Sequence, residues 1–276
     1  RLKSTMEIAG LQQNVDYFQF SYDWRHPNQT SAYNLRNYIN RVQALTGAKK
    51  VSVVAHSMGG LVTRAYIEDM ANPSVRYSGS NTFEDVSQRV DYENNIARFI
   101  MAGTPNMGSG TAIPRWYGGD TLSGNISGEG FVNDSMMQYY LGLIQEDYIE
   151  ANQTDNPVAS LYLQEQVPAT RDLLPTYETT MMKKSFEPTL LNPNNFVESW
   201  LPRITDNVFL DALNAKSHSE DSNLNEIDTL AMAGGGQETV RSVHFLEDNP
   251  IVTPISKLFH LWSYWHIESD GKRYWF

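Results

Sequence analysis

The feature that most constrains the fold is the stretch VSVVAHSMGGLVTRAYIED, residues 51–69. Within residues 49–55, the positions after the two lysines carry small or β-branched side chains, nearly all of them apolar. This pattern predicts a buried parallel strand. The apolar run stops just before Ser57, two glycines follow, and residues 58–70 have the pattern of a helix. The stretch therefore predicts a strand that turns directly into a helix, with a serine at the turn.

This serine has a structural and a chemical interpretation. In the first, Ser57 is only a residue of a tight turn; in the second, its hydroxyl is a nucleophile at the carboxyl end of the strand, beside a helix N-terminus that favours developing negative charge. The positions two before and two after it, where the backbone comes close, hold the small residues Ala55 and Gly59. This spacing favours the nucleophile, with the Met58 N–H as one oxyanion donor. His56 adjoins the serine and points elsewhere, so we do not expect it to be the base.

The rest of the chain alternates between helix and strand patterns. The predicted helices cover residues 4–14, 31–46 and 58–70, and the predicted strands cover residues 17–24, 49–55, 96–105 and 227–235, the last as a buried strand. This order is typical of an α/β fold with a mostly parallel sheet and crossover helices.

The middle of the chain breaks this alternation. Residues 106–226 are rich in Asn, Pro, Gly and Ser, with helical pieces at 134–152 and 201–215. We interpret them as a cap or lid insertion over the sheet edge. The predicted core is then formed by residues 1–105 and 227–276, which together with the insertion fit a chain of 276 residues.

Charge and composition exclude several classes of function. The net charge of −11 argues against nucleic-acid binding, because such a surface repels phosphates. The absence of cysteine excludes disulfides, thiolate metal sites and a cysteine nucleophile. We expect no metal and no cofactor. No uninterrupted apolar run approaches the ~18 residues of a membrane span.

Five short segments together resemble a known family. They are YDWR (22–25), HSMGG (56–60), GTPNMGS (103–109), LLP within RDLLPTYE (171–178), and MAGGGQETV (232–240). In this order they resemble the lecithin:cholesterol acyltransferase family of α/β-hydrolases. Asn106 is a small departure, because the family usually has histidine or another polar residue after Gly-Thr-Pro.

The resemblance implies an α/β-hydrolase fold and a serine esterase, lipase or lipid O-acyltransferase that works through an acyl-serine. Ser57 corresponds to the nucleophile and Met58 to an oxyanion donor. The implied substrate is a lipid or other ester. The resemblance favours a protein that is exported or associated with a membrane surface, and we expect a bacterial host. Hydrolysis and transfer stay open, because only the acceptor differs. The alternative is a non-catalytic hydrolase-fold module that binds a lipid or a partner.

The other members of a catalytic triad are harder to find in this sequence. Asp248 precedes His260 and His266, which satisfies the order Ser, Asp, His, but no family motif surrounds them. Asp270 has no histidine after it.

The family's second oxyanion loop precedes its YDWR segment, and no residue before Tyr17 matches it. We therefore expect this sequence to be an internal piece of a longer protein. The loop would lie before Arg1, the acid and histidine would lie after Phe276, and the piece alone would have little or no activity.

Overall fold

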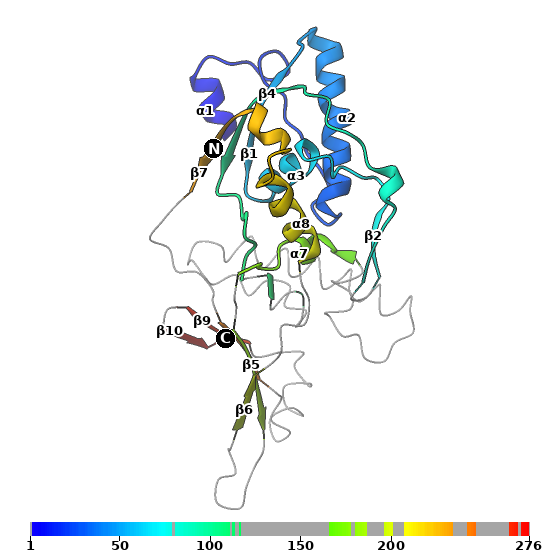
Figure 1. Ribbon diagram of the computed structural model, residues 1–276. Coiled ribbons are helices and arrows are strands. Elements are labelled where there is room, and N and C mark those ends of the chain that lie inside the picture. Colours follow the sequence, from blue (N-terminus) through cyan, green and yellow to red (C-terminus); the bar gives the residue numbers. More distant parts are fainter. Residues whose placement is uncertain are drawn as a thin grey trace, which may run out of the picture. The chain divides into compact units, whose positions relative to one another are not determined.

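The computed structural model describes most of the first half of the chain and parts of the second (Figure 1). The described residues are 2–78, 81–110, 112–113, 116, 166–177, 180–186, 196–200, 207–233, 242–246, 265–269 and 272–275. The chain divides into two compact units, which are described separately. Unit 1 comprises Arg1–Arg76, Thr82–Asn106 and Asp211–Gly234, and unit 2 comprises Tyr77–Asn81, Met107–Leu210 and Gly235–Phe276.

Unit 1 contains a three-stranded parallel sheet. Its strands are β1 (Val51–His56), β4 (Ile96–Ala102) and β7 (Asp228–Met232), in the order β1-β4-β7. Both neighbouring pairs are parallel, with Ala55 opposite Met101 and Met101 opposite Ala231. The prediction of a parallel sheet from these three segments is confirmed, with ends that differ by a few residues.

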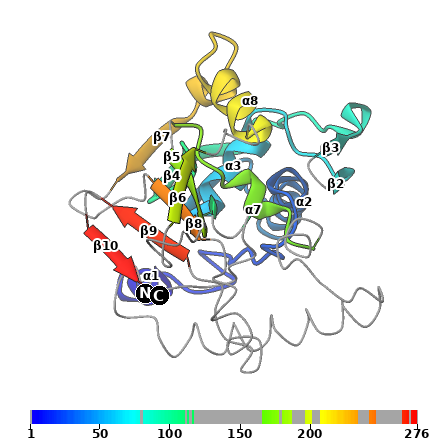
Figure 2. The same ribbon diagram turned by 90° about the horizontal axis from the view of Figure 1, so that it is seen from below.

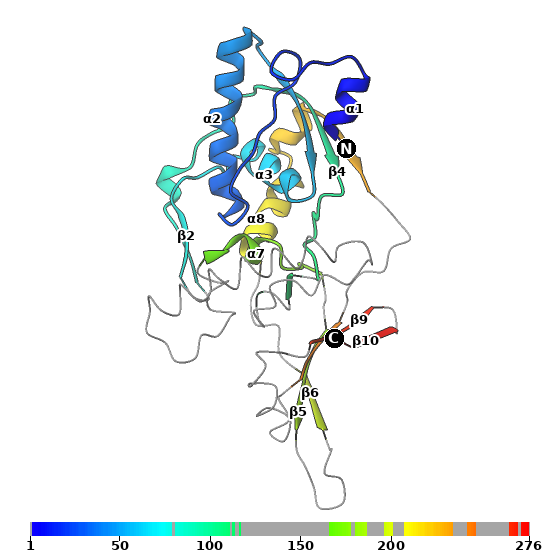
Figure 3. The ribbon, with the colours of Figure 1, turned by 180° about the vertical axis from the view of Figure 1, so that it is seen from behind.

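Two helices of unit 1 pack beside each other on this sheet. They are α2 (Asn28–Thr46) and α3 (Met58–Ile67), and Figures 1 and 3 show them side by side. The helix α2 ends at Thr46 and is followed by Gly47, which adopts the left-handed conformation at φ 72° that glycine tolerates best. The core of unit 1 forms around α3, whose apolar residues Leu61, Val62, Ala65, Tyr66 and Ile67 are all at most 1% exposed.

The remaining described helices and turns, and one pair of strands, are each at most 10 residues long. They are α1 (Leu2–Ile8), β2 (Val75–Ser78), β3 (Asn81–Glu84), the 3-10 turn η1 (Val86–Gln88), α7 (Ala169–Asp172), α8 (Val208–Ser217) and the 3-10 turn η2 (Asn223–Glu226). The strands β2 and β3 form a two-stranded sheet. The predicted helical piece at 201–215 is confirmed in part by α8, which begins at Val208, whereas residues 201–206 and 134–152 lie outside the described residues.

Unit 2 contains a five-stranded sheet, visible in Figure 2, that the sequence did not predict. Its strands are β5 (Thr180–Phe186), β6 (Phe196–Trp200), β8 (Ser242–Leu246), β9 (Trp265–Ser269) and β10 (Lys272–Trp275), in the order β10-β9-β8-β5-β6. The β5–β8 pair is parallel and the other three pairs are antiparallel. The division into a core of residues 1–105 and 227–276 and a cap of residues 106–226 stays a prediction.

Three sequence predictions differ from the structure. Residues 17–24 do not form a strand; Tyr17 makes one isolated bridge to Gln13, and the following residues have no ladder partner. Their aromatic side chains pack locally instead, with Phe20 stacked on Tyr22 at 5.6 Å between ring centroids. The helix predicted over 4–14 ends at Ile8. The predicted buried strand near 227–235 is exposed along all of β7, because β7 pairs with β4 alone among the described strands.

Candidate active site

Ser57 lies at the turn between β1 and α3, as the sequence predicts. The strand ends at His56, the helix begins at Met58, and Ser57 is the single residue between them. Its backbone has φ 54° and ψ −131°. A positive φ is uncommon for a residue with a side chain and costs about 1–3 kcal/mol, so the surrounding structure must hold it in place. The strained strand-to-helix turn is the geometry that presents a nucleophilic serine in α/β-hydrolases.

The Ser57 hydroxyl does not cap the helix that it precedes. Serine is a preferred N-cap residue because its oxygen accepts a hydrogen bond from the first turn, yet no such bond forms here. The side chain is half-buried rather than enclosed. A purely structural turn serine is expected to use its oxygen as a cap. The hydroxyl instead makes no hydrogen bond to the helix and lies beside its N-terminus.

Met58 occupies the first position of α3. The first N–H groups of a helix have no acceptor within the helix, so the Met58 N–H is one of the donors that an anion at this end could use. Met58 is half-buried, like Ser57. The two predicted site residues therefore adjoin at the carboxyl end of β1. The Ser57 hydroxyl and the Met58 N–H are thus neighbours, as an attacking oxygen and an oxyanion donor have to be.

The two glycines after Ser57 differ in how much space a side chain would have. A Cβ atom added to Gly59 would lie 3.8 Å from the Ala55 Cβ, which is an ordinary van der Waals contact. A Cβ atom added to Gly60 would lie 1.9 Å from the Thr104 Oγ1. The close approach of positions 55 and 59 is therefore as predicted, but the position that excludes any side chain is Gly60.

The turn after β4 adjoins the Ser57 turn. The Ser57 N–H donates to the Ala102 carbonyl at 2.9 Å, and the Gly103 N–H donates to the Met232 carbonyl at 2.9 Å. The ends of all three strands of unit 1 are thus joined to one another. The Gly-Thr-Pro turn at 103–105 begins at the residue after Ala102, so it lies at the same edge of the sheet as Ser57.

Two buried charged residues that the sequence analysis missed lie behind Ser57, one on α3 and one directly after its last residue. Arg64 is 4% exposed and Glu68 is fully buried. Burial lowers the pKa of the Arg64 guanidinium, an effect that the charge of Glu68 opposes. One carboxylate oxygen of Glu68 accepts from the Ser222 hydroxyl at 2.6 Å. A signal was present in the sequence: the two residues are four apart on a helix that is otherwise largely apolar.

The YDWR segment places its charged pair in one compact loop. The Arg25 guanidinium donates to both carboxylate oxygens of Asp23, through Nε at 2.9 Å and through the terminal nitrogen at 2.6 Å. These bonds lower the pKa of Asp23 to about 2. Burial raises the pKa of Tyr22. The segment thus has a defined conformation, although it is not the strand that the sequence predicts.

Unit 2 brings together two of the family-like motifs. The Ser109 N–H donates to the Leu173 carbonyl at 2.8 Å, and a Cβ atom added to Gly108 would lie 2.3 Å from the Leu174 carbonyl oxygen. Gly108 has φ 80°, so glycine is required here both for the backbone and for the space. The Gly-Ser end of GTPNMGS therefore packs on the Leu-Leu-Pro element.

The candidate acids and histidines are mostly outside the described residues. Asp248, His260 and Asp270 lie outside them, and His266 lies on β9 of unit 2, opposite His244 in the β8–β9 ladder. His56 is exposed at the end of β1. The general base therefore stays unassigned.

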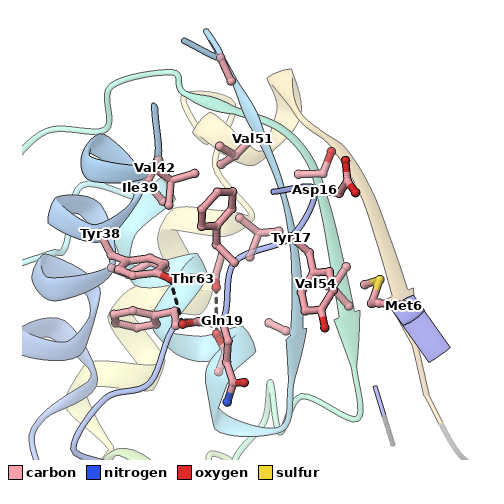
Figure 4. A pocket seen from close by; sticks show the side chains of 18 of the residues that line it. Met6, Asp16, Tyr17, Gln19, Tyr38, Ile39, Val42, Val51, Val54 and Thr63 are labelled. Atoms are coloured by element: carbon pink, nitrogen blue, oxygen red, sulfur yellow. Dashed lines mark hydrogen bonds between the residues drawn. The ribbon is translucent and has the colours of Figure 1, made fainter. Parts of the chain in front are cut away.

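A cavity of about 890 Å³ runs along β1 in unit 1 (Figure 4). All six residues of β1 line it, together with aromatic side chains of the 17–22 segment and apolar side chains of α2 such as Ile39 and Val42. It reaches His56 and Gly59, but Ser57 and Met58 are not among its lining residues. The cavity lies along the strand behind the turn, so it is not evidence for a substrate site at Ser57.

Among the described residues, no group of three or more His, Asp or Glu side chains could hold a metal ion. The expectation of no metal and no cofactor stays a prediction. None of the described helices is long and apolar enough to cross a membrane.

A model of the lecithin:cholesterol acyltransferase family matches residues 2–139. The chain belongs to the lecithin:cholesterol acyltransferase family. The match covers the YDWR segment, the Ser57 turn and the Gly-Thr-Pro turn, so the resemblance predicted from these motifs is confirmed. The fold is that of the α/β-hydrolases, with a parallel sheet and crossover helices in unit 1.

Two solved structures are similar to this member of the acyltransferase family. The Bacillus licheniformis lipase BlEst2 in its mature form is 16% identical, with a TM-score of 0.26 over 75% of this chain and 66% of that one. EstA from Clostridium botulinum is also 16% identical, with a TM-score of 0.22 over 63% of this chain and 47% of that one. The present chain therefore spans less than two thirds of either protein. Likenesses at such TM-scores do not define a fold, which rests here on the family match and on the sheet of unit 1.

Proposed function

We propose that the protein is a serine-dependent carboxyl-ester hydrolase or O-acyltransferase that acts on lipid esters. The observation that carries the proposal is the conformation of Ser57: one residue between a parallel strand and a helix, at φ 54°, with a hydroxyl that does not cap the helix. Membership of the acyltransferase family supports the same chemistry. In the proposed reaction Ser57 is the nucleophile and the Met58 N–H is one oxyanion donor.

The proposed reaction has two halves. The Ser57 Oγ attacks the ester carbonyl carbon while a general base takes its proton, and the carbonyl oxygen becomes an anion next to the Met58 N–H. The tetrahedral intermediate collapses to an acyl-serine and releases the alcohol, which takes up a proton. Water then releases the acid in hydrolysis, or an acceptor alcohol takes the acyl group in transfer. In both cases Ser57 regains its proton.

We propose further that residues 106–226 act as a cap that controls access of water and acceptor, and that the substrate is presented at a membrane surface outside the cytoplasm. Nucleic acid is not an expected partner, given the net charge of −11. The alternative function is a hydrolase-fold module that binds a lipid or a partner without catalysis. It is favoured by one observation: among the described residues, no hydrogen bond links the Ser57 hydroxyl to a histidine.

The decisive experiment uses the protein expressed from its complete reading frame and a fluorophosphonate probe. We expect the probe to label the wild type, and Ser57→Ala to lose labelling together with about 10³-fold or more of the ester hydrolysis. The matched control is Ser52→Ala, which removes an exposed serine from β1, the strand that precedes Ser57. This variant should keep its labelling.

The results separate the candidates. A folded wild type that is not labelled would favour the binding module. Labelling that persists in Ser57→Ala would reject Ser57 as the nucleophile. Single substitutions His260→Ala and His266→Ala test the histidines of this sequence as bases, because loss of the base should slow labelling as well. Product analysis with a labelled ester and an added alcohol distinguishes hydrolysis from transfer.

A further inference from the structure

Arg64 lies two helical turns after Ser57 on α3 and contacts the turn that follows β4. One terminal nitrogen of its guanidinium donates to the Asn106 side-chain oxygen at 2.9 Å. The other donates to the Asn214 side-chain oxygen at 3.0 Å and to the Ser217 hydroxyl at 2.8 Å, and lies 3.5 Å from the Leu213 carbonyl. One buried side chain therefore joins the nucleophile helix to the β4 turn and to α8.

The four acceptors around this cation are neutral, and the charge that opposes the effect of its burial is that of Glu68, which is itself buried. Burying a charge is costly, and an apolar side chain of similar size often gives equal or greater stability at such a position. Stability alone is therefore a poor explanation for Arg64. The guanidinium does offer several donors in a fixed planar arrangement, which suits a residue that sets the geometry of its neighbours.

The β4 turn is held at both ends by one face of α3. Asn106 is fixed twice, because Arg64 binds its side chain and the Asn214 amide donates to its carbonyl at 2.9 Å. Thr104 lies against Gly60. Gly60 and Arg64 are four residues apart, so they share a face of the helix. The turn 103–106 starts beside the Ala102 carbonyl that accepts from the Ser57 N–H.

We propose that Arg64 is a positioning residue, which acts through Asn106 to hold the turn 103–106 beside Ser57 as one wall of the ester site. This inference rests on the proposed function of Ser57. The wall sets where the carbonyl carbon lies relative to the Ser57 oxygen, and a shift of about 1 Å in such an arrangement can slow the chemistry by about 10²-fold. Arg64 itself touches no reacting atom.

The test compares two variants that each remove one acceptor from the same guanidinium. Asn106→Ala removes its side-chain bond to the turn, and Ser217→Ala removes one of its bonds to α8, that to the Ser217 hydroxyl. We expect the two variants to lose similar stability in urea unfolding. We also expect Asn106→Ala to slow fluorophosphonate labelling and kcat for short-chain esters by about 10-fold or more, and Ser217→Ala to change them by less than about twofold.

Arg64→Lys provides the second arm, because lysine keeps the charge but cannot reach the same acceptors in one plane. It should slow labelling as Asn106→Ala does, and the double variant should be no slower than either single one. Equal slowing by Asn106→Ala and Ser217→Ala, or additive effects of Arg64→Lys and Asn106→Ala, would overturn the proposal.

The two proposals fail in different ways. If the folded wild type is not labelled at Ser57, the proposed ester chemistry fails. Hydrogen exchange at the amides of Gly103, Thr104 and Asn106 then still tests the positioning: it should quicken in Arg64→Lys and stay unchanged in Ser217→Ala. Unchanged exchange in Arg64→Lys would show that the turn does not depend on Arg64.

Discussion

Thr104 lies so close to Gly60 that position 60 has no room for a side chain. A Cβ atom there would be 1.9 Å from the Thr104 Oγ1 and 2.8 Å from its Cβ. Because the Thr104 Cβ itself is too near, rotation of its side chain cannot relieve the overlap, and the backbone of one segment has to move. The second glycine of HSMGG is thus fixed by the turn after β4, whereas Gly59 has ordinary contacts.

Gly60→Ala should therefore destabilise the protein by about 1–3 kcal/mol, and it should slow labelling of Ser57. Gly59→Ala is the matched control, because it adds the same atoms one residue earlier and has room for them. It should leave stability unchanged or raise it by up to about 1 kcal/mol, since alanine favours a helix. Urea unfolding measures both. Equal losses in the two variants would contradict the geometry of this turn.

Asp69 connects three segments at the end of α3, and its removal should be costly. Its carboxylate accepts from the Tyr92 N–H at 2.7 Å, the Lys216 ammonium at 3.0 Å and the Asn223 amide at 3.1 Å, and its backbone has φ 56°. Asp69→Ala should cost about 2–4 kcal/mol, because it leaves these donors without their acceptor and alanine disfavours this φ.

Asn in place of Asp69 tolerates the positive φ and keeps an oxygen for the Tyr92 N–H, so Asp69→Asn should cost clearly less. The exposed Asp221 is the control site, where alanine should change stability by less than about 0.5 kcal/mol. Chemical unfolding followed by fluorescence would measure the series. If asparagine were as damaging as alanine at position 69, the shared hydrogen bonds would not be the cause.

The Asp23–Arg25 pair should make stability depend on pH at the acid end. The hydrogen bonds from Arg25 lower the pKa of Asp23 from 3.8 to about 2. The carboxylate therefore contributes stability above pH 3.8, and that contribution is lost as the pH falls through about 2. The effect is small, because the pair is partly exposed and screened by salt.

Carboxyl-carbon NMR should show Asp23 titrating near pH 2 in the wild type and closer to 3.8 in Arg25→Gln. High salt should bring the two titrations nearer to each other, since screening weakens exposed charge pairs. A wild-type midpoint that already lies near 3.8 would show that the pair does not persist in solution.

The Ser57 turn could be predicted because its signals are local. A short apolar run, a serine and two glycines determine the strand, the turn and the helix start within a few residues. The anchors of that turn could not be predicted in this way. Arg64 binds Asn106 and Asn214, which lie 42 and 150 residues after it in the sequence. No pattern in the sequence indicates which distant segments will meet.

The error at residues 17–24 has a related cause. Alternating aromatic residues fit a strand only where a neighbouring strand supplies hydrogen bonds, because strand propensity depends on its context. In the structure Phe20 packs on Tyr22 and Tyr38, and the Tyr38 hydroxyl donates to the Gln19 carbonyl. These aromatic side chains therefore pack against one another and against Tyr38 of α2, and not within a sheet.

The contact of Gly108 and Ser109 with Leu173 and Leu174 has a consequence for the length of chain that separates them. Ser109 is hydrogen-bonded to Leu173 and Gly108 lies against Leu174, so the two ends of the stretch between them are joined to one another. Doubling the length of such a closed stretch costs only about 0.6 kcal/mol of closure entropy. The number of residues between the two motifs can therefore change at a small cost in stability, while the two motifs stay bonded to each other.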